Sequence, residues 1–283
     1  MYAFPIGIML DSLKMDTQPA IEKAARLGAK GLQMYATHGA YSPQELNVAA
    51  RRELLDMVKS NGLVFSALCG DLGQGFGNRE KNPELLEASK RILDLAKDLE
   101  TDVVTTHIGV VPADANHERY KIMQEACFVL SAYADSMDAH FAIETGPETP
   151  EVLKAFLDTL GSRGLAVNYD PANLVMVTAS DPARGVHVLK DYIVHTHAKD
   201  GRRLFYRDPE VIYGLSDDVI VTSDSFIELP LGDGDVHFDT YLAALEEIGY
   251  TGFLTIEREV GDNPVADIEK AVAFLNNTMR KEQ

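Results

Sequence analysis

The stretch "YIVHTHAKDGRR" (192–203) is an apolar run that ends abruptly in histidines and charged side chains. Other short apolar runs alternate with longer stretches of helical periodicity; they span 4–10, 31–35, 63–69, 102–107, 140–144, 164–170 and 252–257. Strands that are apolar on both faces and separated by helices are typical of a parallel sheet. Eight such units close a (β/α)8 barrel. We therefore expect an α/β fold, a single TIM barrel domain over residues 1–283. An open doubly wound sheet is the alternative, disfavoured because no glycine-rich dinucleotide loop follows the first run.

The predicted helices between these runs carry apolar residues along one face. They span 18–28, 42–62, 83–100, 116–138, 149–161, 181–190, 238–250 and about 264–280. Ser42 is the predicted N-cap of the second helix, with Pro43 in its first turn. The segment 198–237 is too long for an ordinary connection, so we expect part of it to close over a substrate as a lid.

Charge and cysteine content narrow the class of partner. The formal net charge is −18, from 26 basic and 44 acidic side chains. Such a surface repels phosphate backbones and anionic membranes, so we expect a small-molecule partner, no nucleic acid and no membrane. Only two cysteines occur, without CxxC spacing, which favours a reducing, cytoplasmic location. The N-terminus has no basic segment before its apolar part and is interpreted as a strand.

Polar side chains close the apolar runs, and the carboxyl end of a barrel strand is where catalytic residues lie. The residues at five of these ends are His107, Glu144, Asp170, His197 and Glu257. The barrel would gather them into one ring. Each has a structural alternative: His107 as a core histidine, Asp170 as part of a turn before Pro171, the glutamates as caps. His195 lies two residues before His197, so one is expected to be a ligand and the other its support. Cys69 is expected to be a packing residue.

Two glutamates, one aspartate and one histidine offer three oxygens and one imidazole nitrogen. That donor set suits one divalent metal ion, Mn²⁺ first, with Mg²⁺ or Co²⁺ as alternatives. Zn²⁺ is less favoured because it prefers more nitrogen or sulfur ligands.

Four motifs occur in a fixed order: "AIETGPE" (142–148), "NYDPANL" (168–174), "VHTHAKDG" (194–201) and "LTIERE" (254–259). Together with "LPLGDGDVHFDTYLAAL" (229–245), this set resembles the xylose isomerase-like barrels over nearly the whole chain. That family includes sugar and sugar-phosphate isomerases and epimerases, inosose-processing enzymes and type IV AP endonucleases.

The resemblance implies roles for individual residues. In the ketose 3-epimerase branch one metal is held at the positions of Glu144, Asp170, His197 and Glu257, and the two glutamates act as acid and base on opposite faces of the sugar. It also implies that Arg203 helps bind substrate, and it matches His107 to a histidine that the endonucleases use as a metal ligand. We expect His107, Glu148, Asn173 and Lys199 to bind substrate as well. Asn173 replaces a histidine usual in that branch. Lys199 and Arg203 could bind a substrate carboxylate or phosphate, and a solvated loop charge is the alternative for Lys199.

The expected function is a metal-dependent isomerase or epimerase of a small keto sugar, sugar phosphate or related polyol. A proton next to a carbonyl would be removed and returned through a metal-stabilised enediolate. A hydride shift and an inosose-type dehydration on the same site remain alternatives. An AP endonuclease-like phosphodiesterase is disfavoured by the net charge and by Asn173, and a non-catalytic sugar-binding barrel would not need two opposed carboxylates. Relatives are often dimers or tetramers, so a homodimer or homotetramer is expected.

Overall fold

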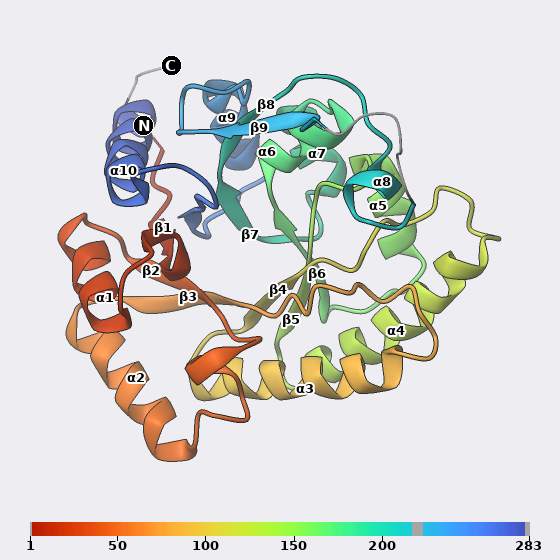
Figure 1. The fold of residues 1–283 in the computed structure, drawn as a ribbon, viewed down its shortest axis with the longest axis horizontal. Helices are drawn as coiled ribbons and strands as arrows, with labels where there is room; N and C mark the ends of the chain where they lie inside the picture. The colour runs from red at the N-terminus through yellow and green to blue at the C-terminus, as the bar shows by residue number, and fades with distance from the viewer. Residues whose placement is uncertain (1, 217–222, 281–283) are drawn as a thin grey trace.

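Eight parallel strands close into a barrel in the computed structural model, which describes residues 2–216 and 223–280 (Figure 1). Around the barrel the strand order is β1-β10-β7-β6-β5-β4-β3-β2, and β1 pairs with β10 to close the ring. The strands are β1 (Ile6–Met9), β2 (Gly31–Tyr35), β3 (Val64–Cys69), β4 (Val103–Thr106), β5 (His140–Glu144), β6 (Leu165–Tyr169), β7 (Ile193–Ala198) and β10 (Leu254–Ile256). The predicted (β/α)8 barrel is confirmed, and the open sheet is excluded.

Helices surround this barrel, as Figure 1 shows. Those that follow the strands are α1 (Thr17–Arg26), α2 (Val48–Ser60), α3 (Asn82–Asp98), α4 (Glu118–Asp135), α5 (Pro150–Asp158), α7 (Pro182–Leu189), α9 (Phe238–Glu247) and α10 (Pro264–Arg280). Two of them begin in the same way, because Thr149 and Asp181 accept hydrogen bonds from backbone N–H groups of the first turn and a proline follows each cap. No helix in the described part of the chain is long and apolar enough to cross a bilayer.

The start of the second helix differs from the prediction. Ser42 begins a turn, and α2 starts six residues later, where the Asn47 side chain accepts hydrogen bonds from the N–H groups of Ala49 and Ala50, each at 3.0 Å. The guanidinium of Arg51 donates to the carbonyl oxygen of Leu46 at 2.8 Å and so holds this turn against the helix. Asn47 is therefore the cap, and the prediction of Ser42 was wrong.

The molecule has two different interiors. Between the strands and the helices the packing is apolar, whereas the inside of the barrel buries polar side chains such as Gln33, Thr105, Asn168 and Thr255. Thr255 fits because the facing residue is Gly7: a Cβ atom there would lie 2.5 Å from the Thr255 hydroxyl. The polar interior lies directly beneath the mouth at which the strands end.

The segment predicted as a lid forms an antiparallel hairpin, β8 (Asp200–Arg203) with β9 (Phe226–Leu229). The short helix α8 (Pro209–Ile212) lies between them. The hairpin packs against α6 (Pro171–Asn173) and the π-helical turn Leu174–Thr178 that continues it. Residues 217–222 of the segment lie outside the described residues, and closure over a substrate stays a prediction.

One buried carboxylate fixes both ends of this insertion. Asp200 accepts hydrogen bonds from the backbone N–H groups of Gly201, Gly232, Gly234 and Val236, at 2.8–3.0 Å. Position 234 must be glycine for this contact, because a Cβ atom would lie 2.1 Å from the Asp200 oxygen. The glycine-rich turn before α9 is thus a cradle for Asp200.

Candidate metal centre and active site

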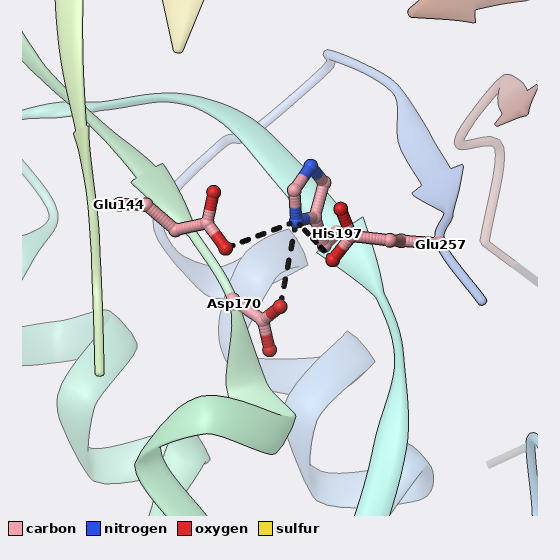
Figure 2. A group of neighbouring side chains, drawn as sticks. All are labelled: Glu144, Asp170, His197 and Glu257. Carbon is pink, nitrogen blue, oxygen red and sulfur yellow. Dashed lines mark hydrogen bonds and ion pairs between the residues drawn. The ribbon is translucent and has the colours of Figure 1, made fainter. Parts of the chain in front are cut away.

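Four buried side chains converge at the carboxyl ends of neighbouring strands (Figure 2). Glu144 is the last residue of β5, Asp170 and Glu257 follow β6 and β10, and His197 lies in β7. Their potential ligand atoms all lie within 4.8 Å of one another. The Nδ1 atom of His197 lies 3.5 Å from Glu144, 3.4 Å from Asp170 and 3.3 Å from Glu257. Four of the five residues predicted at the strand ends therefore form one cluster.

Asp170 serves this cluster and its own helix at once. Its Oδ1 atom caps α6 by accepting from the N–H of Asn173 at 2.9 Å, while Oδ2 faces His197. The turn expected as an alternative for Asp170 and the ligand position are therefore the same conformation.

The ring of His197 is oriented by a residue from across the barrel. Its Nε2 atom lies 3.0 Å from the side-chain oxygen of Gln33, and the Gln33 amide donates to the Thr105 hydroxyl at 2.8 Å. With the ring proton on Nε2, the lone pair of Nδ1 points at the three carboxylates. This is the arrangement that supports a metal-binding histidine.

The charge of the cluster favours a cation. Burial alone would lower the pKa of His197, but the negative charges of Glu257 and Glu144 outweigh it and raise that pKa well above its usual value. Three buried carboxylates around one imidazole need positive charge, since isolated buried carboxylates are costly. Three hard oxygens and one nitrogen fit Mn²⁺, Mg²⁺ or Co²⁺. The residues present therefore fit the predicted ion.

His195 takes the supporting position. Burial lowers its pKa well below the usual range, so the ring is neutral. Its Nδ1 atom lies 2.8 Å from the Asn168 side-chain oxygen, and its Nε2 atom lies 2.9 Å from the Thr255 hydroxyl. Asn168 in turn donates to Glu144 at 3.0 Å. A hydrogen-bonded layer beneath the cluster thus fixes one of the two glutamates.

A cavity of about 230 Å³ opens above the cluster. Among the predicted residues, its walls include Cys69, His107, Glu144, Asn173, Lys199 and Glu257. Residues that the sequence did not point to also line it: Tyr35, Asp71, Tyr213, Glu228 and Glu259. Tyr213 and Glu228 come from the inserted segment, which therefore supplies one wall of the cavity.

The comparisons with known proteins agree with the barrel fold. The model of the "Xylose isomerase-like TIM barrel" family matches residues 21–278. The chain belongs to the xylose isomerase-like TIM barrel family. An uncharacterised protein of Methanocaldococcus jannaschii is 25% identical over 226 residues, covering 75% of this chain and 69% of the relative.

Solved structures of xylose isomerase-like barrels superpose on nearly the whole chain. A xylose isomerase domain protein from Planctomyces limnophilus has a TM-score of 0.79 at 23% identity and covers 97% of this chain and 96% of its own. The probable 3-DHS dehydratase of Bacillus anthracis has a TM-score of 0.74 at 18% identity, with coverage of 98% and 100%. A D-tagatose 3-epimerase-like protein has a TM-score of 0.74 at 20% identity, with coverage of 97% and 98%. At these identities the likeness concerns the fold.

Two of the residues assigned to substrate binding lie beside Glu144 in this xylose isomerase-like site. The Asn173 amide donates to Glu144 Oε1 at 3.1 Å. The Nε2 atom of His107 lies 3.6 Å from the same oxygen. Both side chains line the cavity, so each is placed to contact a ligand and to hold Glu144.

Lys199 is buried at the wall of the cavity. Its ammonium group lies 3.0 Å from Glu257, in contact with Glu259, and 3.8 Å from Glu228. Burial alone would lower the pKa of Lys199, but these carboxylates, with Asp170, raise it well above the usual value. The expected alternative of a solvated loop charge does not describe this side chain.

Glu148 and Arg203 make contacts within the chain and are not part of the cavity wall. The Glu148 carboxyl accepts a hydrogen bond from the N–H of Val111 at 3.1 Å. Arg203 donates to the carbonyl oxygen of Phe205 at 3.3 Å and lies over the ring of Tyr206, 5.1 Å from its centroid. Their assignment to substrate binding stays a prediction.

Proposed function

We propose that this protein is a divalent-metal-dependent isomerase or epimerase of a small keto sugar or related polyol. The observation that carries the proposal is the placement of Glu144 and Glu257 on either side of His197 in a buried cluster at the barrel mouth. The two glutamates come from β5 and β10, with β6 and β7 between them, so a bound sugar between them would meet one carboxylate on each face.

The positive charges beside both glutamates favour the ionised form that a base requires. Burial opposes ionisation of each, but the charges of His107 and His197 lower the pKa of Glu144, and those of His197 and Lys199 lower the pKa of Glu257. When bound by Glu144, Asp170, His197 and Glu257, a divalent ion would supply the positive charge that stabilises an enediolate. Mn²⁺ is the proposed ion.

Proton transfer then falls to the two carboxylates. One carboxylate takes the proton next to the substrate carbonyl. For epimerisation the other, once it has taken up a proton from solvent, returns a proton to the opposite face; for isomerisation the first carboxylate gives its proton to the neighbouring carbon. The amides of Asn168 and Asn173 hold the two oxygens of Glu144, and Lys199 holds Oε2 of Glu257. These contacts fix the carboxylates relative to a substrate, as proton transfer requires.

The experiment is a panel of keto sugars incubated with Mn²⁺-loaded protein in D2O. Proton transfer through a carboxylate places solvent deuterium at the reacting carbon, whereas a hydride shift leaves that carbon unlabelled. Glu144→Gln and Glu257→Gln keep the size and one oxygen, and each should lower the rate by at least about 10²–10⁴-fold. Glu246→Gln, on the exposed face of α9, is the control and should leave the rate unchanged.

Turnover without deuterium incorporation would refute the two-glutamate mechanism. Undiminished rates in either glutamine variant at the site would refute the assignment of the acid and base. Loss of water from a substrate would instead identify the dehydratase alternative, which uses the same acids.

The cellular location and the oligomeric state are also proposals. Both cysteines are buried and free, which supports a cytoplasmic location. A homodimer or homotetramer stays a prediction that light scattering would test.

A further inference from the structure

The walls of the active-site cavity carry a strong excess of negative charge. Five carboxylates line it, those of Asp71, Glu144, Glu228, Glu257 and Glu259, and Asp170 lies beneath. Lys199 is the one lysine or arginine among the described residues that line it. A divalent ion, the Lys199 ammonium and the Arg258 guanidinium that pairs with Glu228 together offset at most four of these six carboxylates, so the cavity stays negative when an ion is bound.

The Lys199 ammonium is surrounded by carboxylates of the chain. It offers three N–H donors, and the carboxylates of Glu257, Glu259 and Glu228 surround it within 3.8 Å. A phosphate or carboxylate placed on Lys199 would lie beside three groups of its own charge.

The nearby arginines are also committed elsewhere. Arg258 donates to Glu228 at 2.7 Å and to Asp267 at 2.8 Å, behind the cavity wall. Arg203 lies over Tyr206. Arg207 lines a neighbouring hollow of about 460 Å³, but Asp224, Glu228 and Glu259 line the same hollow. Neither hollow offers the cluster of guanidinium groups that phosphate recognition uses.

We infer that the substrate is an uncharged keto sugar or polyol, without a phosphate ester or a carboxylate. The inference rests on the proposed function for the reaction and adds the class of substrate. The carboxylates of Glu228 and Glu259 accept hydrogen bonds from hydroxyl groups, as does the Asp71 carboxylate. The cavity of about 230 Å³ is smaller than the roughly 300–1,000 Å³ typical of drug-sized ligands, which suits one sugar.

Matched substrates test the inference. D-ketohexoses and D-ketopentoses, each with its terminal phosphate monoester, are compared in the Mn²⁺-loaded protein by deuterium uptake and by calorimetric binding. We expect uptake and binding with unphosphorylated sugars and a kcat/KM at least about 100-fold lower for each phosphate ester, because like charges brought together in a site strongly disfavour binding. A phosphate ester that reacts as well as its parent sugar overturns the inference.

The two measurements separate this inference from the proposed function. Binding of the uncharged sugars without deuterium uptake refutes the proton-transfer function and leaves the substrate class supported. Binding and reaction of the phosphate esters alone refutes the substrate class and leaves the function. Neither binding nor uptake with any member of the panel overturns both.

A variant that removes one negative charge tests whether the carboxylates cause the discrimination against phosphate esters. Glu259→Gln removes a carboxylate from the group around Lys199 without touching the four ligand residues. It should tighten binding of the phosphate esters about tenfold relative to the parent sugars. Glu53→Gln, an exposed change of equal charge on α2, should leave that ratio unchanged. An unaltered ratio in Glu259→Gln contradicts the proposed role of the carboxylates.

Discussion

Two groups of buried charged side chains lie side by side at the mouth of the barrel. They differ in how the negative charge of their carboxylates is compensated. In the metal cluster (Glu144, Asp170, His197 and Glu257) three carboxylates face one imidazole. In the hairpin cluster (Glu228, Arg258 and Asp267) the guanidinium of Arg258 joins both acids, and Arg258 and Glu228 are buried to a similar degree as the ligand residues. Lys199 lies between the two groups, in contact with Glu257 and Glu259.

We propose that the difference separates acids that bind a metal ion from acids that stabilise the fold. A buried carboxylate must be paired or neutralised. Arg258 does this for the hairpin cluster from within the chain, and so ties β9 to the segment after β10. In the metal cluster Lys199 forms an ion pair with Glu257, but no lysine or arginine among the described residues pairs with Glu144 or Asp170, so their charge is available to an ion.

The largest expected effect comes from breaking the metal cluster. His197→Ala should remove the ion and lower turnover by at least about 10⁴-fold, since the charge and the geometry it provides are both lost. Mn²⁺ should stabilise the natural protein by about 2.7 kcal/mol at a hundred times its Kd and leave the variant unchanged. Metal analysis and thermal unfolding measure both effects.

His187→Ala is the control, because that histidine is on the outer helix α7, paired with Glu247 at 3.3 Å. Equal metal content in His197→Ala and His187→Ala would contradict the ligand assignment.

An intermediate effect is expected in the hairpin cluster. Arg258→Met leaves Glu228 and Asp267 without their guanidinium partner and should cost about 3–5 kcal/mol in the free energy of unfolding. Arg163→Met removes an exposed pair with Asp135 and should cost about 0–1 kcal/mol. Urea unfolding of both variants measures the difference.

The metal content of Arg258→Met should stay that of the natural protein if the two clusters have separate roles. Loss of the ion in this variant, or a cost no larger than that of Arg163→Met, would show that the comparison between the clusters is wrong.

The smallest effect, taken over one pH unit, concerns Glu148, a buried carboxyl that accepts a hydrogen bond from the Val111 N–H. Burial raises its pKa from 4.5 to about 8. Between these values the folded chain keeps a proton that the unfolded chain releases, so stability falls as the pH rises, by at most about 1.4 kcal/mol per pH unit. Glu148→Gln keeps an acceptor for the Val111 N–H and should flatten this fall.

Unfolding free energies measured across that window give the test, with the exposed Glu53→Gln as the control. The same slope in the natural protein and in Glu148→Gln would mean that the Glu148 carboxyl is already ionised.

The sequence predicted the barrel and the meeting of four acid and histidine side chains at its mouth, because each of them ends an apolar run and the closed sheet brings the ends of these runs together. Gln33 gave no such signal. It is one polar residue inside "GLQMY", and only the closure of the barrel brings it to His197, 164 positions away along the chain. Polar residues such as Asn168, one layer below the strand ends, are the sequence signal that would have predicted the hydrogen-bonded layer beneath the cluster.

The start of α2 and the pairing of β8 with β9 could not be predicted from the sequence, because each depends on contacts that local sequence patterns do not show. Ser42 and Asn47 are both good N-caps, and the hydrogen bonds of Arg51 to the turn favour the second. The pairing of β8 with β9 joins residues on either side of a long insertion, without a short turn between them. Glu148 and Arg203 make contacts within the chain that the sequence did not indicate, and their predicted role in substrate binding is still to be tested.

The cradle of Asp200 has a consequence for the evolution of specificity. Because four backbone N–H groups and the β8–β9 ladder close the base of the insertion, the chain between Leu204 and Ser225 is anchored independently of its own length. Doubling the length of a flexible loop costs only about 0.6 kcal/mol in closure entropy. This piece can therefore be exchanged or extended as a module, changing one wall of the cavity while the ligands on the barrel strands stay in place.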